Sequence, residues 1–387
     1  MLNRPASAIR VVQVVQNLHY GGMERLLHDT VRALDRKGFE LHVVVVDKLG
    51  RFAEGLDEVA VLHQLPAMSK LSFLHPAALI SRLRGIGADI VHSHGGIWYK
   101  ASRAARRLGI PLVHTEHGRP DPDRVIDRLV DNLASRSTEV VIAVSEAVAD
   151  VLRRRVVHDP ARVRVITNGV KVERLESTEE PLAVRRELGI PDGALVIGSV
   201  GRLEAVKNYR LALEALARLA DRSGGEYGDR AYLVLVGDGS GRAELEGYAR
   251  DLGIAGRVRF LGWRDDAERL YRAFDLFTLT SRSEGTSVSL LEAMGSGLCP
   301  IVTDVGGNRA VLGDDLSCLL VAPDDEAGLA AAWISYLSDA ERRKAVGDRA
   351  RRRVQAVFSL DGMVEKYASL YRELGYRRPR SRPGAGR

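Results

Sequence analysis

The order of apolar and polar residues predicts an α/β protein built from two similar halves. In the first half, short runs of valine, isoleucine and leucine alternate with stretches in which apolar residues recur at helical spacing. We interpret the following runs as strands: 11–15, 41–46, 60–65, 89–94, 111–117, 139–144 and 163–167. Because these runs are nearly continuous in apolar residues, they are typical of a parallel sheet covered by helices on both faces.

The same alternation returns after an interruption. Residues 171–192 are charged, contain two prolines and offer no buried strand, so we interpret them as a linker. Further strands are predicted beyond it, at 195–201, 232–237, 258–262, 276–280 and 299–304. The predicted organisation is one domain at 1–175, a second at 190–355, a crossover helix at 356–375 and a disordered basic tail at 376–387. Two such halves imply a cleft between them, a common place for a ligand site.

Composition narrows the class of protein. The chain has 387 residues, of which 45% are hydrophobic, enough for two domains of ordinary size. No apolar run approaches the ~18–20 residues of a membrane span, and the first ten residues lead into a strand rather than a signal peptide. Cys299 and Cys318 are the only cysteines, too few for a disulfide framework or a thiolate metal site. We therefore expect a soluble, cytoplasmic protein.

The charge is basic. A net charge of +6 suits an anionic partner, which could be a nucleic acid, a lipid surface or a phosphorylated substrate. Much of the excess lies in arginine-rich helices, including Arg153, Arg154 and Arg155, for which a solvated helix face and a membrane contact are both open explanations. An aromatic content of 5% without a stacking motif argues against a nucleic-acid binder.

Candidate chemistry gathers where predicted strands end, because ligands of open parallel sheets bind beyond the carboxyl ends of the strands. After the first strand, Gly21 and Gly22 open a helix and allow the backbone to approach a ligand closely, although two such glycines also serve simple turns. After the first strand of the second half, Arg202 and Lys207 stand five residues apart in a loop and can converge on one diphosphate. Scattered surface cations are the alternative.

Four histidines lie at the ends of two other strands. His92 and His94 share one face of their strand, so a zinc site has to be considered, although no third ligand at a suitable spacing accompanies them. His117, in the loop T-E-H-G, suits a hydrogen bond to a substrate hydroxyl or general base work. We interpret His114, and to a lesser extent His92, as a core histidine with satisfied hydrogen bonds.

The stretch S-R-S-E-G-T-S-V-S-L-L-E-A-M-G-S-G at 281–297 carries two glutamates eight positions apart. Glu284 lies in a loop, and a helix is expected to begin near Ser287 with the serine as its cap. Glu292 then lies one and a half turns further on, so the two carboxylates can bind two groups of hydroxyls with a phosphate between them. The backbone N–H groups available to that phosphate belong to Gly285, Thr286, Ser287 and Val288. This is the shape of a nucleotide-sugar.

These residues resemble the retaining GT-B glycosyltransferases of family 4, also called group 1. E-G-T-S-V-S-L-L-E-A-M matches the E-x7-E signature of that family. Other pieces occur in the family's order: Gly-Gly after the first strand, T-E-H-G, N-G-V at 168–170, G-R-L…K-N, V-G-D-G, G-W at 262–263 and V-G-G-N-R at 305–309. The resemblance covers nearly the whole chain. The sequence departs from the family in E-G-T-S, where a phenylalanine or a similar residue usually follows the first glutamate.

The resemblance implies a GT-B fold, in which two Rossmann-like domains face each other across a cleft and the C-terminal helix crosses back. It implies that Arg202 and Lys207 bind the donor diphosphate, that Glu284 holds the hexose and that Glu292 holds the ribose. It places the amides of 285–288 on the phosphate. It places Gly21 and Gly22 in a loop beside the donor phosphate and the acceptor, and His117 near the anomeric carbon.

The implied activity is transfer of a hexosyl unit from a nucleoside-diphosphate sugar to a sugar or lipid-linked hydroxyl acceptor, with retention and without a catalytic metal or other cofactor. The family builds exopolysaccharide, lipopolysaccharide or glycolipid at the inner face of the membrane, which makes an anionic membrane a further candidate partner. D-P-D at 121–123 imitates the metal-binding motif of another transferase class. The alternatives are a nucleotide-sugar epimerase or phosphorylase of the same fold, and a non-enzymatic binder of anionic surfaces.

Overall fold

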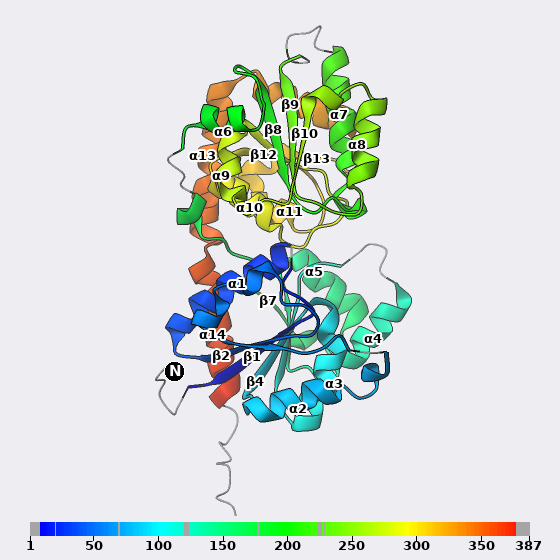
Figure 1. The fold of residues 1–387 in the computed structure, drawn as a ribbon, viewed down its shortest axis with the longest axis vertical. Helices are drawn as coiled ribbons and strands as arrows, with labels where there is room; N and C mark the ends of the chain where they lie inside the picture. Colours follow the sequence, from blue (N-terminus) through cyan, green and yellow to red (C-terminus); the bar gives the residue numbers. More distant parts are fainter. Residues whose placement is uncertain are drawn as a thin grey trace, which may run out of the picture. The chain divides into compact units, whose positions relative to one another are not determined.

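The computed structural model describes residues 8–19, 21–68, 70–119, 124–175, 179–222, 227 and 229–376, and the chain divides into two compact units (Figure 1). Unit 1 comprises the chain up to His117, the stretch that ends at Thr167 and everything from Leu360 on. Unit 2 comprises Asn168–Ser359 with a short piece that begins at Gly118. Each unit is an α/β layer structure around its own parallel sheet, so the predicted fold class with two Rossmann-like halves is confirmed.

The described residues of unit 1 form one seven-stranded parallel sheet in the order β3-β2-β1-β4-β5-β6-β7. Its strands are β1 (Arg10–Val15), β2 (Glu40–Val45), β3 (Val61–Gln64), β4 (Ile90–His94), β5 (Leu112–Glu116), β6 (Val140–Ala143) and β7 (Val163–Val165). They coincide with the seven apolar runs of the sequence. Its helices are α1 (Gly22–Leu34), α2 (Ala77–Ile86), α3 (Trp98–Leu108), α4 (Val125–Ser135), α5 (Glu146–Val151) and α14 (Leu360–Tyr376).

Two hydrophobic cores cover the two faces of this sheet, because side chains alternate along a strand. Val11 and Val15 of β1 point into a core shared with α1 and α14, whereas Val12 and Val14 point into a core shared with α2 and α3. The same alternation places Gln13, between these valines, on the α14 face. The covering of both faces explains why the strands read as almost unbroken apolar runs.

Helix α14 completes unit 1 from the far end of the chain. It lies beside α1 (Figure 1), and Met363, Tyr367, Tyr371 and Leu374 are buried in the core on that face. The expectation that the C-terminal helix crosses back to the first half is confirmed. Its last described residue is Tyr376, and the rest of the predicted basic tail lies outside the described residues.

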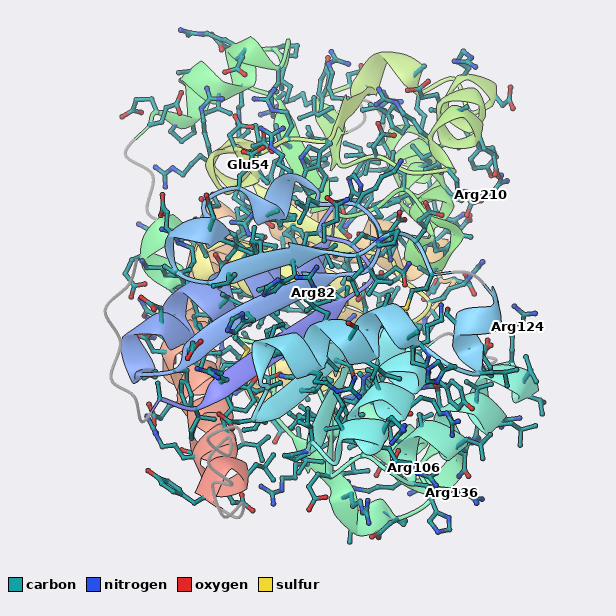
Figure 2. All side chains as sticks on the ribbon, turned by 60° about the horizontal axis from the view of Figure 1, so that its bottom comes forward. Glu54, Arg82, Arg106, Arg124, Arg136 and Arg210 are labelled. Carbon is teal, nitrogen blue, oxygen red and sulfur yellow. The ribbon has the colours of Figure 1, made fainter. Side chains whose placement is uncertain are left out.

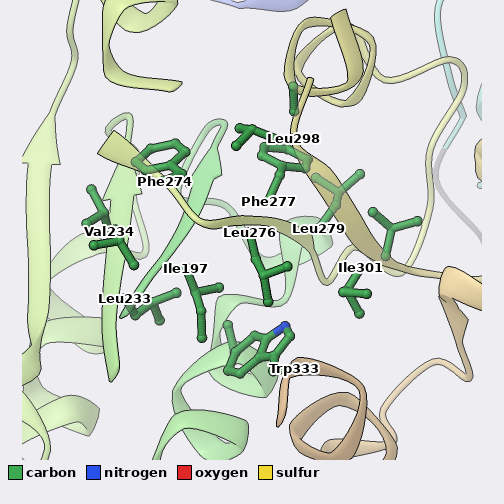
Figure 3. Packing of buried hydrophobic residues seen from close by; sticks show 14 of the residues in the cluster. Ile197, Leu233, Val234, Phe274, Leu276, Phe277, Leu279, Leu298, Ile301 and Trp333 are labelled. Atoms are coloured by element: carbon green, nitrogen blue, oxygen red, sulfur yellow. The ribbon is translucent and has the colours of Figure 1, made fainter. Parts of the chain in front are cut away.

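Unit 2 carries a six-stranded parallel sheet in the order β10-β9-β8-β11-β12-β13. Its strands are β8 (Leu195–Val200), β9 (Ala231–Val236), β10 (Val258–Gly262), β11 (Leu276–Leu279), β12 (Cys299–Thr303) and β13 (Leu320–Val321). Its helices are α6 (Pro181–Glu187), α7 (Tyr209–Arg222), α8 (Arg242–Asp251), α9 (Ala267–Leu270), α10 (Val288–Gly295), α11 (Asn308–Leu312), α12 (Glu326–Leu337) and α13 (Ala340–Val357). Figure 3 shows Ile197, Leu276 and Ile301 of neighbouring strands directed toward the fully buried Trp333 of α12.

Two details of unit 2 differ from the sequence interpretation. The stretch 171–192 is not a free linker, because it contains α6, and Val184, Leu188 and Ile190 are buried in the core of unit 2. The first predicted domain also extends too far, since the boundary between the units falls after Thr167 rather than at residue 175. Strand β13 has only two residues, too few to produce an alternation that sequence reading detects.

Candidate functional site in unit 2 and its counterpart in unit 1

The candidate site of unit 2 lies where the order of the strands reverses. Strand β8 pairs with β9 on one side and with β11 on the other. The loops that leave the carboxyl ends of β8 and β11 therefore run in opposite directions and open a crevice between them, the usual ligand position in such sheets. Arg202 and Lys207 lie in the first loop, and Glu284 lies in the second.

Hydrogen bonds fasten these two loops to each other. The Thr280 hydroxyl donates to the Lys207 carbonyl at 3.0 Å, and the Arg282 amide donates to the Val206 carbonyl at 2.9 Å. Asn208 adopts a left-handed φ of 48°, and its side-chain amide donates to Asp324 at 2.9 Å. The charged residues of both loops are thus held on one common backbone framework.

Lys207 and Glu284 form an ion pair. The distance from Lys207 Nζ to Glu284 Oε1 is 2.6 Å, and only 17% and 8% of the two side chains are exposed. Oε1 also accepts a hydrogen bond from the Ser281 hydroxyl at 2.6 Å. The second carboxylate oxygen, Oε2, makes no hydrogen bond to a described residue, so Glu284 keeps one acceptor for a ligand hydroxyl while Lys207 keeps two N–H donors.

Arg202 is the exposed cation of the first loop. Within the described ranges its guanidinium makes no hydrogen bond or ion pair, in contrast to Lys207. The sequence predicted that the two cations converge on one diphosphate, and in the structure they differ in their contacts. Arg202 offers its full fork to an anion, whereas Lys207 approaches the same crevice already half neutralised by Glu284.

A third loop, which follows β12, contacts the backbone of Glu284. The Gly307 amide donates to the Glu284 carbonyl at 3.3 Å, and a Cβ atom on Gly306 would lie 1.9 Å from the same oxygen. Gly306 also has a φ of 52°, so both space and conformation require glycine there. The V-G-G-N-R sequence thus fixes the backbone that carries the first glutamate.

Two hydrogen bonds define the N-terminus of α10, which the sequence predicted to bind an anion. Ser287 is its N-cap, and the serine hydroxyl accepts from the Leu290 amide, as the sequence predicted. The side-chain amide of Asn168 donates to the Thr286 carbonyl at 2.8 Å. Because C=O and N–H of a trans peptide point in opposite directions, this bond turns the Ser287 N–H away from Asn168. The open N–H groups at the helix start then have a fixed direction.

Glu292 is buried in α10, with 6% of the residue exposed. The Tyr271 hydroxyl donates to its Oε2 atom at 2.9 Å. Sequence reasoning missed Tyr271, because nothing in the spacing of 21 residues between the two positions indicates contact. It also missed Ser281 and assigned no role to Asn168, although N-G-V was one of the noted family pieces.

Unit 1 carries a polar network at the carboxyl ends of its central strands. His92 and His94 do share one face of β4, as expected, and both lie on the α14 face of the sheet. Their ring nitrogens are engaged by neighbours: His92 contacts Tyr371 OH at 2.5 Å and Thr115 Oγ1 at 2.7 Å, while His94 contacts Gln13 Oε1 at 2.8 Å. The remaining nitrogen of His94, Nδ1, lies 3.1 Å from Nε2 of His117.

Burial keeps these rings neutral. It lowers the pKa of His92 to about 3 and that of His117 to about 4, and the pKa of His94 lies well below its ordinary value for the same reason. His114 is separate from this network. It is 1% exposed, stacks on Trp98 with ring centroids 4.0 Å apart and contacts Ser93 Oγ at 3.0 Å, so it lies in the core.

Gly21 and Gly22 lie where the sequence predicted, at the start of α1. Gly22 is the first helical residue and Gly21, with a φ of 149°, is its N-cap. Their loop leaves β1, the strand at which the order of the unit 1 sheet reverses between β2 and β4. The glycines therefore stand at the same sheet edge as the histidine network.

Two motifs bear on metal binding. Over the described ranges, no three His, Cys, Asp or Glu side chains are placed to hold a metal ion together. The D-P-D motif at 121–123 lies outside the described residues.

Comparison with known proteins assigns both halves of the chain to family models. Residues 20–174 match the model described as Glycosyltransferase Family 4, and residues 182–353 match the model described as Glycosyl transferases group 1. A D-inositol 3-phosphate glycosyltransferase of Corynebacterium urealyticum is 32% identical over 349 residues, which span 83% of this chain and 78% of that protein.

Two further relatives extend over nearly the entire chain. The UDP-Gal:alpha-D-GlcNAc-diphosphoundecaprenol alpha-1,3-galactosyltransferase of Escherichia coli is 24% identical, covering 94% of this chain and 97% of its own. The solved structure of HepE from Anabaena, in complex with UDP-glucose, superposes with a TM-score of 0.83 at 22% identity and covers 94% of this chain and all of that one. This structural likeness concerns the fold.

Proposed function

Because this chain belongs to the family 4, or group 1, glycosyltransferases, we propose that it transfers a hexosyl unit from a nucleoside-diphosphate sugar to a hydroxyl acceptor with retention of the anomeric configuration. The observation that carries the proposal is the Lys207–Glu284 ion pair beside the open N-terminus of α10. It joins a cation for a diphosphate and an acceptor for sugar hydroxyls within one crevice.

The donor would lie along α10. Arg202, Lys207 and the amides of 285–288 would bind the diphosphate, and the free Oε2 of Glu284 would accept from a hexose hydroxyl. Glu292, held by Tyr271, would bind the ribose. Two carboxylates on opposite sides of a positive region match the order hexose, diphosphate, nucleoside.

The reaction would proceed on one face of the sugar. The bond between the anomeric carbon and the phosphate oxygen breaks as the acceptor oxygen bonds to the same carbon, and the acceptor proton passes to a phosphate oxygen. Arg202, Lys207 and the helix N-terminus would stabilise the charge that grows on the leaving diphosphate. His117 would hold a sugar or acceptor hydroxyl.

A thermal-shift panel of nucleoside diphosphates and their sugars tests this assignment. The correct donor at 100 times its Kd should stabilise the protein by about 2.7 kcal/mol. Glu284→Gln should reduce the shift from the sugar donor more than the shift from its nucleoside diphosphate, because only the donor carries the hexose. Equal losses for both ligands would contradict the role given to Glu284.

The relatives suggest the chemical class of the acceptor. One is named for an inositol phosphate acceptor and another for a lipid-linked sugar diphosphate, and a third, from Rhizobium meliloti, is named as a lipopolysaccharide core glycosyltransferase. We therefore propose a sugar or lipid-linked acceptor in the synthesis of a bacterial polysaccharide, lipopolysaccharide or glycolipid. Within the described ranges no helix has the length and apolar character needed to cross a membrane.

A membrane contact would suit such an acceptor, and α4 supports it. Val125, Ile126, Leu129 and Leu133 form an apolar stripe on α4, and each is at least 50% exposed. Helix α3 packs beside α4 and exposes Arg103, Arg106 and Arg107, and Figure 2 shows Arg106, Arg124 and Arg136 projecting outward from unit 1. Apolar side chains flanked by cations are typical of a surface that binds anionic lipid, where each basic residue contributes about 1 kcal/mol.

This surface is a better candidate than the Arg153–Arg155 run that the sequence singled out, because Arg153 pairs with Glu146 at 3.1 Å. Co-sedimentation with anionic vesicles should weaken in an Arg106→Gln, Arg107→Gln variant and in an Ile126→Gln, Leu129→Gln variant. The Arg154→Gln, Arg155→Gln variant removes the same charge elsewhere and serves as the control. Equal binding to neutral vesicles, or no binding at all, would contradict a contact with anionic lipid.

An epimerase or phosphorylase of the same fold is the second candidate, and no observation favours it. Incubation with nucleotide-sugars alone separates the two, since only an epimerase would change the sugar without an acceptor. A phosphorylase would require phosphate.

A further inference from the structure

The candidate site in unit 2 does not explain why two buried tyrosine hydroxyls of α14 lie at the strand ends of unit 1. Tyr367 and Tyr371 lie on α14 and are 3% and 0% exposed. They reach the histidine network from residues more than 250 positions away in the chain. A purely hydrophobic contact would need no hydroxyl, so each OH must serve the polar network that it enters.

The order of donors and acceptors in this network follows from the orientation of the Gln13 side-chain amide. The Gln13 side-chain nitrogen donates to Tyr371 OH at 3.1 Å, so the amide oxygen is the atom that faces His94. An amide oxygen only accepts hydrogen bonds. The His94 Nε2 atom, 2.8 Å away, must therefore carry a proton.

This order extends to His117. A neutral His94 with its proton on Nε2 has a bare Nδ1, which accepts from His117 Nε2 at 3.1 Å. His117 must then carry its proton on Nε2, and its own Nδ1 is left with a lone pair. No hydrogen bond from the described residues occupies that Nδ1. His94 and His117 thus each have one neutral tautomer that agrees with the orientation of the Gln13 amide.

Tyr371 supports this order because its hydroxyl accepts from the Gln13 side-chain nitrogen at 3.1 Å. The hydroxyl also contacts His92 Nδ1 at 2.5 Å, and it is the hydrogen-bond partner that the amide nitrogen has in this orientation. Without the hydroxyl, the amide could turn over and donate to His94, and every proton along the path would shift to the other nitrogen.

We propose that Tyr371 is a positioning residue for His117: acting through Gln13 and His94, it fixes His117 as the tautomer that presents a bare Nδ1 to a hydroxyl of the substrate. The low pKa values of the three rings agree with a path of neutral imidazoles. The part that concerns substrate rests on the proposed function, whereas the tautomer is a property of the protein alone.

Nitrogen NMR of the full-length, ligand-free protein with labelled histidine tests the tautomer, because protonated and bare ring nitrogens resonate far apart. The wild type should show His117 protonated only on Nε2. Tyr371→Phe and Gln13→Met should both produce a mixture of tautomers. Tyr367→Phe is the matched control, since its hydroxyl lies one turn earlier on α14 and contacts Thr115 at 3.3 Å, off the path to His94. A wild-type proton on Nδ1, or an unchanged tautomer in both test variants, would overturn the inference.

Measurements of kcat distinguish a failure of this inference from a failure of the proposed function. If half of the molecules hold the wrong tautomer, kcat with the identified donor should fall about twofold in Tyr371→Phe and stay unchanged in Tyr367→Phe. His117→Ala should cost more than either. Normal turnover in His117→Ala would contradict the role proposed for His117 while leaving the tautomer result intact.

Discussion

At the scale of single residues, the buried charge pair of unit 2 has two roles. Lys207 neutralises Glu284 in the free protein and remains available to an anion, so the pair couples stability to ligand binding. A loop lysine would ordinarily be replaceable without loss of stability. This one is not, because its partner is 8% exposed.

Lys207→Ala should therefore destabilise the protein as well as slow the reaction. Leaving Glu284 buried without its cation should cost about 2–4 kcal/mol in the free energy of unfolding, toward the lower end for buried pairs because Lys207 is partly exposed. Turnover should fall about 10²–10³-fold, as on removal of a preorganised charge donor. Chemical denaturation checks the first value and kinetics the second.

The double variant Lys207→Met, Glu284→Gln is the control for that experiment. It removes both charges, so most of the stability should return while turnover stays low. Arg202→Ala should reduce turnover without a change in stability, since Arg202 is exposed. A stable, active Lys207→Ala variant would place the diphosphate elsewhere.

Tyr271→Phe should weaken donor binding about fivefold, because it removes one hydrogen bond worth about 1 kcal/mol from Glu292. Glu292→Ala should weaken it further, and Glu284→Ala should affect turnover more than affinity, since hexose contacts can tighten in the transition state. Calorimetric Kd values beside kcat values check this order. Wild-type affinity in both Tyr271→Phe and Glu292→Ala would mean that the ribose is held by other groups.

At the scale of elements, the candidate site residues lie at strand ends and helix starts, and the sequence predicted the positions of these elements well. The strands of both sheets other than β13, and the Ser287 cap, follow from local patterns of apolar and capping residues. The Lys207–Glu284 pair does not, because its members are 77 residues apart and nothing in the sequence fixes the register of one loop against the other. Helix α6 was missed because it has only seven residues, among which Val184 is the buried one, so it shows no repeated apolar spacing.

The affinity of the α10 N-terminus for a nucleoside diphosphate should depend on the hydrogen bond from Asn168 to the Thr286 carbonyl. Asn168→Ala frees the Thr286 carbonyl, so the N–H groups lose their fixed direction. The Kd of the nucleoside diphosphate that gives the largest thermal shift should rise about tenfold, the value of one hydrogen bond to a charged group. Ser296→Ala, which removes a hydroxyl at the other end of the helix, should leave this Kd unchanged. Equal Kd values in both variants would contradict the role of Asn168.

The histidines at the ends of β4 and β5 should make the fold sensitive to acid. Their pKa values are lowered in the folded protein, to about 3 for His92 and about 4 for His117, so the unfolded chain binds more protons below about pH 6.5. The free energy of unfolding should therefore fall as the pH decreases from about 6.5 to 4. Urea titrations across this range check the slope, which should be shallower in His92→Gln. An equal slope in that variant would assign the effect to carboxylates.

At the scale of the whole molecule, positive charge is supplied by side chains and helix ends. The net charge of +6 and the assignment of charge neutralisation to Arg202, Lys207 and α10 make a metal unnecessary to the proposed chemistry.

Transfer should consequently withstand EDTA. Activity measured before and after chelation, with the identified donor, should agree within error. A loss that magnesium or manganese restores would assign a ligand role to D-P-D at 121–123 or to the histidines.

The return of α14 to unit 1 has a consequence for how the chain is made. On the ribosome, residues up to Thr167 emerge first, yet their sheet lacks the buried side chains of Met363, Tyr367 and Tyr371 on one face. Unit 2, which follows, already has its complete sheet and helices before Leu360 is translated. Synthesis from the N-terminus ordinarily favours folding of the first domain first. Here the earlier half can complete its core only after the later one has been made, and the part of the sheet face that α14 covers stays open throughout that interval.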